Sequence, residues 1–253
     1  MNFFGLWAVS LLLVSIRIGM VLAMTPILGA MSIPAVLRVL IPLGIAAAMT
    51  LALPVTRYRG DIDLMAIMGA AAIEVAVGAM LGLGVLFAFA TFSVAGRLLD
   101  IQIGFGIAQL LDPATRQNVP LLTGVMTQLG VLCLFAMDVH HTLLRALAYS
   151  YDVFPAGEPW AIAQSLPVVI RHAGSMFMLA FALVAPVVTA LLLVELGLSV
   201  LSRNLPQMNM FVLGMPIKVI VGVGALVVWI GVAGVHVSRI FDAIFHSWEA
   251  LFR

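Results

Sequence analysis

The chain alternates between long apolar runs and short polar interruptions. Six runs contain no charged residue, and most of them approach the about 20 residues that a helix needs to cross the hydrocarbon core of a bilayer. They cover residues 18–37, 39–56, 75–96, 117–137, 173–194 and 219–235. This pattern predicts a bundle of membrane-spanning helices.

Composition supports the same class. Hydrophobic residues make up 64% of the chain, charged residues 9%, and mean hydropathy is +1.21. We therefore expect an all-α integral membrane protein, because helices satisfy their own backbone polar groups in lipid. The net charge is only +1 and the basic residues are scattered singly, so nucleic acid is not an expected partner.

Prolines interrupt the predicted helices more often than a simple bundle requires. Pro26, Pro34 and Pro42 punctuate the first two runs, and residues 32–34 look like the turn of a short hairpin. Residues 64–94 carry one charge only and predict a helix longer than one perpendicular span. Gly78 and Gly82 within it have the spacing that lets another helix approach closely.

A polar interruption at residues 104–122 lies between two apolar runs and contains glycine and proline. Irregular backbone at membrane depth is tolerated only against protein or along an aqueous path. We name residues 104–122 the gate segment, since a pathway or a gate is the first hypothesis. The alternative is a rigid packing loop.

Ionisable side chains inside apolar runs are costly unless they are paired, so they predict contacts between helices or subunits. The candidates are Arg17, Glu74, Asp138, Arg145, Glu195 and Lys218. The spacing of Asp138, His141 and Arg145 predicts a local ion pair, with a proton relay as the alternative.

Metal binding and disulfide formation are not expected from this sequence. His140 and His141 would point about 100° apart on a helix, so they would need ligands from elsewhere to hold a metal. Cys133 is the only cysteine and lies in an apolar run. Motifs of metalloproteases, serine hydrolases and nucleotide-binding loops are absent from the sequence, so neither an enzyme nor a cofactor is expected.

A second interruption, at residues 202–218, carries two prolines and several methionines. Methionine is flexible, so the cluster either lines a seal that reshapes or fills gaps in a membrane core. The candidate hairpin-turn residues are Pro206, Gln207, Asn209, Gly214 and Pro216, with residues 219–235 as the return helix. The remaining residues, 238–253, predict a short amphipathic tail.

Several of these motifs together resemble the FliR family of flagellar biosynthetic proteins and the related SctT-type proteins of virulence secretion systems. The resemblance rests on Arg17, TPILG at 25–29, SIP at 32–34, Ala95 with Gly96, and two longer motifs. These are QIGFGIAQLLDP at 102–113 and PQMNMFVLGMPIK at 206–218, and the resemblance covers nearly the whole chain.

The resemblance implies a single-copy subunit of a type III export gate in the bacterial inner membrane. Its implied partners are several copies each of FliP-like and FliQ-like subunits, a larger FlhB-type membrane protein, and unfolded export substrates. Residues 1–203 would be a FliP-like part and residues 204–253 a FliQ-like hairpin. The gate segment would supply the channel plug.

Within that plug, the glycines would supply the hinge, the apolar residues the seal, and the polar residues the anchors. The residues concerned are Gly104, Phe105, Gly106, Ile107, Gln109, Leu110, Leu111, Asp112, Pro113, Arg116, Gln117, Asn118 and Pro120.

The chain departs from the family pattern at Arg97, where the family commonly has an acid. This departure changes the charge pairing beside Asp100.

Three alternatives to a flagellar export gate remain open from the sequence. The virulence branch is an alternative to the flagellar one. A secondary transporter would use Glu74, Asp138 and Glu195 as ligands, and a purely structural scaffold would line no path.

Overall fold

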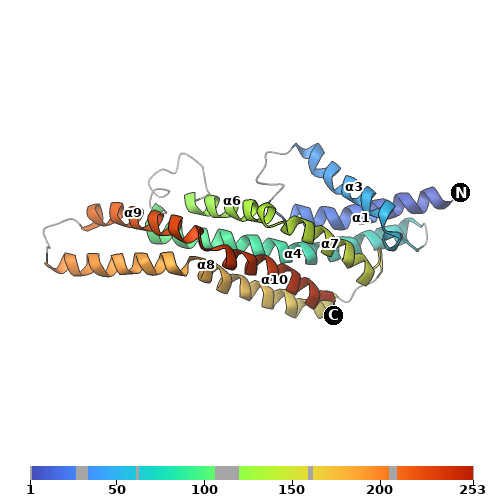
Figure 1. The fold of residues 1–253 in the computed structure, drawn as a ribbon. Helices are drawn as coiled ribbons and strands as arrows, with labels where there is room; N and C mark the ends of the chain where they lie inside the picture. Colours follow the sequence, from blue (N-terminus) through green and yellow to red (C-terminus); the bar gives the residue numbers. More distant parts are fainter. Residues whose placement is uncertain are drawn as a thin grey trace. The chain divides into compact units, whose positions relative to one another are not determined.

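A computed structural model describes residues 2–26, 34–60, 63–105, 120–158, 162–204 and 210–252. These residues form helices joined by turns (Figure 1). The α-helices are α1 Asn2–Ala23, α3 Ala35–Ala52, α4 Leu64–Ile103, α6 Leu121–Ala136, α7 Val139–Val153, α8 Ile162–Asn204, α9 Met210–Ile230 and α10 Gly234–Phe252, with a short 3₁₀ helix η1 at Pro54–Thr56.

The described helices are long and apolar enough for a membrane protein. Five of them could each cross a bilayer, and a sixth span results if the bent pair α6 and α7 counts as one. Large apolar side chains such as Met65, Met178 and Val228 are more than 70% exposed, as expected for surfaces that face lipid or other subunits. The prediction of an all-α integral membrane protein is confirmed.

The chain divides into two compact units. Unit 1 contains Met1–Phe89, Leu134–Gly174 and Phe241–Arg253, and unit 2 contains Ala90–Cys133 and Ser175–Ile240. Each unit takes residues from both sides of position 203, so this spatial division does not follow the proposed FliP-like and FliQ-like parts. That assignment stays a prediction.

In unit 1, α1 packs closely on the first half of α4 because glycines remove side chains from the contact (Figure 1). A Cβ atom at Gly78 would lie 2.9 Å from the Arg17 carbonyl oxygen, and one at Gly82 would lie 2.8 Å from the Met24 sulfur. The close approach predicted from the glycine spacing is confirmed.

The C-terminal helix α10 is amphipathic, as predicted for the tail. Phe241, Ile244 and Trp248 are buried, whereas His246 and Glu249 are exposed. The Trp248 indole N–H donates to the Leu81 carbonyl of α4 at 3.0 Å, and Gly84 leaves room for the indole ring. A buried indole N–H thus finds the partner that it requires.

The proline-rich N-terminal third differs from the runs read off the sequence. The run at residues 18–37 is divided, since α1 ends at Ala23 and α3 begins at Ala35. Pro34 precedes the first turn of α3, where a missing N–H costs nothing, but Pro42 lies inside that helix. Residues 32 and 33 of the predicted hairpin turn lie outside the described residues.

Candidate functional site

Asp100, near the end of α4 in unit 2, holds the first turn of α6. Its carboxylate accepts the backbone N–H of Leu122 at 2.9 Å on Oδ1 and that of Thr123 at 2.9 Å on Oδ2. The Thr123 hydroxyl donates a further bond of 2.8 Å to Oδ2. Asp100 therefore caps α6 from a different helix, where a negative charge also suits the helix dipole.

Glycine makes this contact between α4 and α6 possible. A Cβ atom at Gly96 would lie 2.5 Å from the Thr123 Cα and 2.8 Å from the Leu122 carbonyl oxygen. Both neighbours are backbone atoms that cannot turn aside. Ala95, which is fully buried, and Gly96 thus allow α4 and α6 to pack closely, and Asp100 joins them by hydrogen bonds.

The same residue marks the other end of the gate segment. The Gly104 N–H donates to the backbone carbonyl of Asp100 at 3.1 Å, and Gly104 has a φ of 101°, which disfavours residues with a side chain. The gate segment therefore departs from and returns to the same point of unit 2. The Asp100 side chain holds the return end, whereas the bond at Gly104 is the regular backbone bond that closes the last turn of α4.

Most predicted plug residues lie outside the described residues. Gly104 and Phe105 are described at the end of α4, and Pro120 just before α6. The others, Gly106, Ile107, Gln109, Leu110, Leu111, Asp112, Pro113, Arg116, Gln117 and Asn118, fall at positions 106–119, and their roles stay predictions. What the structure describes is the frame that holds this segment.

A cavity of about 460 Å³ adjoins Gly104 within unit 2 and has a mostly apolar lining with a few polar side chains. Its walls come from the end of α4, from α8 and from α9. The Glu195 carboxylate and the Lys218 ammonium form an ion pair in its wall, and the Gln102 side-chain amide lies 3.5 Å from Glu195. The side chains of the pair are partly open to solvent, 42% for Glu195 and 23% for Lys218.

In unit 1, Arg17 of α1 and Glu74 of α4 form a buried, two-point ion pair. Arg17 Nε lies 2.7 Å from Glu74 Oε2 and Nη2 lies 2.9 Å from Oε1, with both side chains at 0% exposure. This parallel geometry is the strong form of an arginine–carboxylate contact.

The remaining donors and acceptors of that pair are also satisfied. Arg17 donates to Ser150 Oγ at 3.1 Å and to the Phe154 carbonyl at 3.0 Å. Its guanidinium lies 3.9 Å from the centre of the Tyr151 ring. Glu74 accepts the Gly157 N–H at 3.0 Å. The pair thus joins α1, α4, α7 and the following turn.

Among the intramembrane charges, the structure pairs Arg17 with Glu74 and Glu195 with Lys218, two pairings that the sequence did not specify. For Asp138 the partner is His141, at 3.5 Å between Oδ1 and Nδ1. Arg145 is exposed and takes no part in the ion pairs found among the described residues. The prediction that included Arg145 assumed one continuous helix, whereas α6 ends at Ala136 and α7 begins at Val139.

The predicted hairpin turn is too long at its C-terminal end. Gly214 and Pro216 lie inside α9, which begins at Met210, so neither belongs to a turn. Neighbouring membrane helices often accommodate a proline in this way. Pro206, Gln207 and Asn209 lie outside the described residues, and their place in the turn stays a prediction.

Asp100 is the functional residue that the sequence analysis missed. We considered it only for its pairing with Arg97, yet Arg97 is exposed and no ion pair among the described residues joins the two. An available signal was its position, because an acid in the last turn of an apolar helix opposes that helix's own dipole. Such an acid indicates a partner on another element.

Comparison with known proteins gives consistent matches along the chain. Residues 8–244 match the family model described as bacterial export proteins, family 1. The flagellar biosynthetic protein FliR of Bacillus subtilis is 32% identical over 187 residues, which are 70% of each chain. FliR of Escherichia coli is 28% identical over 235 residues, 91% of this chain and 88% of the relative. Yop proteins translocation protein T of Yersinia pestis is 28% identical over 181 residues, 71% and 69% of the two chains.

Proposed function

The chain belongs to the bacterial export proteins, family 1, and from this membership we propose that it is a subunit of a type III protein-export gate. It works as a channel component rather than as an enzyme. Its place is the bacterial inner membrane, in the basal body of a flagellum or of a secretion apparatus.

The observation that carries this proposal is the cap that Asp100 places on α6. Its carboxylate accepts the Leu122 and Thr123 N–H groups, so the return end of the gate segment is held by a residue four positions before Gly104, where the segment begins. A segment fixed at both ends can close a path and move aside without losing its place in the bundle. The gate segment accordingly acts as the plug of a channel through which unfolded proteins cross the membrane.

The cargo is flagellar in this proposal. Two of the relatives described above are named flagellar biosynthetic proteins. The Yersinia relative supports the alternative, an equivalent subunit of a virulence or symbiosis secretion system. Either branch gives the chain the same position in an export apparatus.

The proposed partners are other membrane subunits of that apparatus. One copy of this chain assembles with several FliP-like and several FliQ-like subunits, next to a larger FlhB-type protein. The exposed apolar side chains of α3, α8 and α9 provide surface for such contacts.

The ion pairs speak against the secondary-transporter alternative. That function requires carboxylates free to take up ions or substrate. Glu74 is fully buried and committed to Arg17, and Glu195 is paired with Lys218. Of the three carboxylates considered, Asp138 alone is largely exposed, with 77% of its side chain open to solvent.

The test of assembly is purification of the full chain from its own bacterium in mild detergent, followed by native mass spectrometry. We expect a complex with one copy of this chain and several copies of two other small membrane proteins. A stable monomer or homodimer without such partners would contradict the proposed function.

A second experiment separates a gate from a scaffold. A photo-cross-linking amino acid is placed at Ile107 or Leu110, and a stalled export substrate is trapped in the complex. We expect adducts with the substrate from both positions but none from Met178, a matched control position that is 76% exposed on α8. Equal labelling from Met178, or none from the gate segment, would favour the scaffold.

A further inference from the structure

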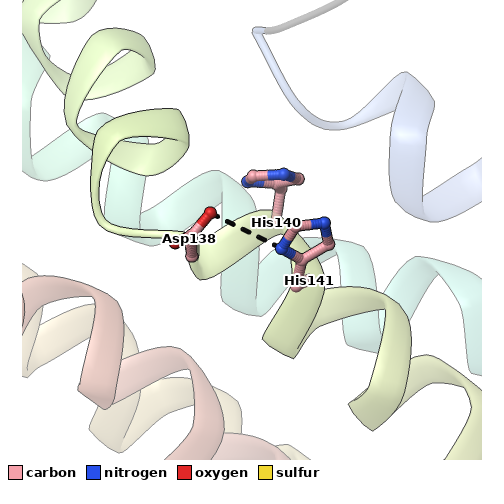
Figure 2. A group of neighbouring side chains, drawn as sticks. All are labelled: Asp138, His140 and His141. Atoms are coloured by element: carbon pink, nitrogen blue, oxygen red, sulfur yellow. Dashed lines mark ion pairs between the residues drawn. The ribbon is translucent and has the colours of Figure 1, made fainter.

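Two histidines and an aspartate come together where α6 gives way to α7 in unit 1. Asp138 lies in the break between the helices, and His140 and His141 are in the first turn of α7 (Figure 2). We propose that Asp138, His140 and His141 form a binding site for a divalent transition-metal ion of the zinc type.

The backbone at Asp138 creates this arrangement. Its φ of 56° and ψ of 20° are left-handed, a conformation that aspartate and asparagine tolerate better than most residues. This turn carries the carboxylate toward the two imidazole rings, as Figure 2 shows. The sequence argument against a metal site assumed a helix through these positions and a missing third ligand, and the break supplies that ligand.

The spacing of the side-chain atoms suits one small ion. One ligand atom from each residue can be chosen so that all lie within 4.8 Å of one another. Asp138 Oδ1 and His141 Nδ1 are 3.5 Å apart. Two ligands at tetrahedral angles around zinc, each about 2.0–2.1 Å from the metal, lie roughly 3.3 Å apart. Small side-chain rotations are therefore enough to close the site.

The atoms required for binding are not committed elsewhere in the described structure. An aspartate before a helix normally accepts an N–H of the first turn, yet Asp138 makes no such side-chain bond. The buried Nδ1 of His140 has no hydrogen-bond partner among the described residues. The His140 ring is held from one side by Phe135, with ring centres 5.0 Å apart.

The ligand set selects the class of ion. Two imidazoles and one carboxylate favour zinc, cobalt, nickel or copper over magnesium and calcium, which prefer oxygen ligands only. Three protein ligands leave a coordination position open for water or for a group from another subunit. The carboxylate also offsets the positive end of the α7 dipole, which would otherwise oppose a cation.

The test is isothermal titration calorimetry, in which zinc is titrated into the full chain. The chain is purified in detergent with an affinity tag that lacks histidine. We expect one zinc per chain. Each of the variants Asp138→Asn, His140→Gln and His141→Gln should weaken binding by about 10-fold or more, since even supporting residues of metal sites contribute that much. Asparagine preserves the left-handed backbone preference, so this variant changes the charge and not the turn.

The chain supplies a matched control at its C-terminal helix. His246 and Glu249 of α10 form an exposed histidine–carboxylate pair at 3.7 Å with the same three-residue spacing, and the metal-capable group found among the described residues does not include them. His246→Gln should therefore leave zinc affinity unchanged.

Cobalt gives a second readout that does not depend on heat, because its visible absorption reports tetrahedral coordination. We expect this signal in the wild type and in His246→Gln, and its loss in the three site variants. The absence of zinc binding, or equal weakening by His246→Gln and His141→Gln, or unchanged binding in the three variants, would overturn the proposal. None of these results bears on assembly with export partners.

Discussion

The Arg17–Glu74 pair of unit 1 and the Glu195–Lys218 pair of unit 2 are built from similar residues in opposite surroundings. The first is fully buried, is joined by two hydrogen bonds and is surrounded by further hydrogen-bond partners. The second is partly exposed and lies in the wall of the cavity beside Gly104.

This contrast separates a structural from a functional use of charge in a membrane protein. Removing one partner of a buried pair leaves an uncompensated charge at high cost, whereas a partly hydrated pair contributes little to stability. We infer that Arg17 and Glu74 stabilise unit 1, and that Glu195 and Lys218 contribute to export at the start of the gate segment.

The largest expected effect comes from Glu74→Gln. This variant leaves the Arg17 guanidinium buried without its counter-charge, which should reduce stability by about 3–5 kcal/mol. Thermal unfolding of the purified full chain, followed by tryptophan fluorescence, measures the change. The matched control is Glu195→Gln, the same chemical change in the exposed pair, and equal losses for the two variants would contradict the comparison.

The next largest effect is expected from Asp100→Ala, since two backbone N–H groups and the Thr123 hydroxyl lose a charged partner. The cost is about 1.5–3 kcal/mol for hydrogen bonds of this type. Limited proteolysis should show faster cleavage near residues 104–122. Asp152→Ala, at an exposed acid near the end of α7, is the control and should leave both stability and cleavage unchanged.

Gly96→Ala should cost about 1–3 kcal/mol, because its new methyl group meets α6 backbone that cannot rotate away. Gly69→Ala is the control in the same helix, where a Cβ atom would meet nothing within 4 Å. That change should be neutral or stabilising by roughly 0.5–1 kcal/mol. A neutral Gly96→Ala variant would show that α4 and α6 are not packed this closely.

The smallest effect on stability is expected from Lys218→Met, at about 0–1 kcal/mol. Export should nevertheless fall, because the cavity beside Gly104 loses its charge balance. Swapping the charges with Glu195→Lys and Lys218→Glu together should restore part of the export rate measured in cells. An unfolded Lys218→Met variant would place this pair with the structural one.

The sequence predicted those features that depend on local spacing. Gly78 and Gly82 predicted the close approach of another helix, which the structure identifies as α1, and the tail was predicted to be amphipathic, as α10 is. Features that depend on distant partners were harder to foresee. The position of Asp100 in the last turn of an apolar helix indicates a partner on another element, but it does not identify that partner as the helix that begins at Leu121, because this contact exists only once α4 and α6 are packed.

The break at Asp138 illustrates the same limit at short range. An apolar run ending in Asp138 and two histidines is compatible with a continuous helix, and only the left-handed backbone brings the three side chains together. At Pro216 the error is the opposite one, because a turn was predicted where the helix continues. A proline that would end an isolated helix is accommodated within α9.

The most direct test of the proposed gate is a leak measurement on the assembled complex. Residues 107–118 are deleted, native mass spectrometry verifies that the complex still assembles, and release of a small fluorescent solute from proteoliposomes is followed. We expect rapid release with the deletion and none with the wild type or the neutral control Gly69→Ala. A membrane that stays tight around a fully assembled, deletion-bearing complex would contradict the gate.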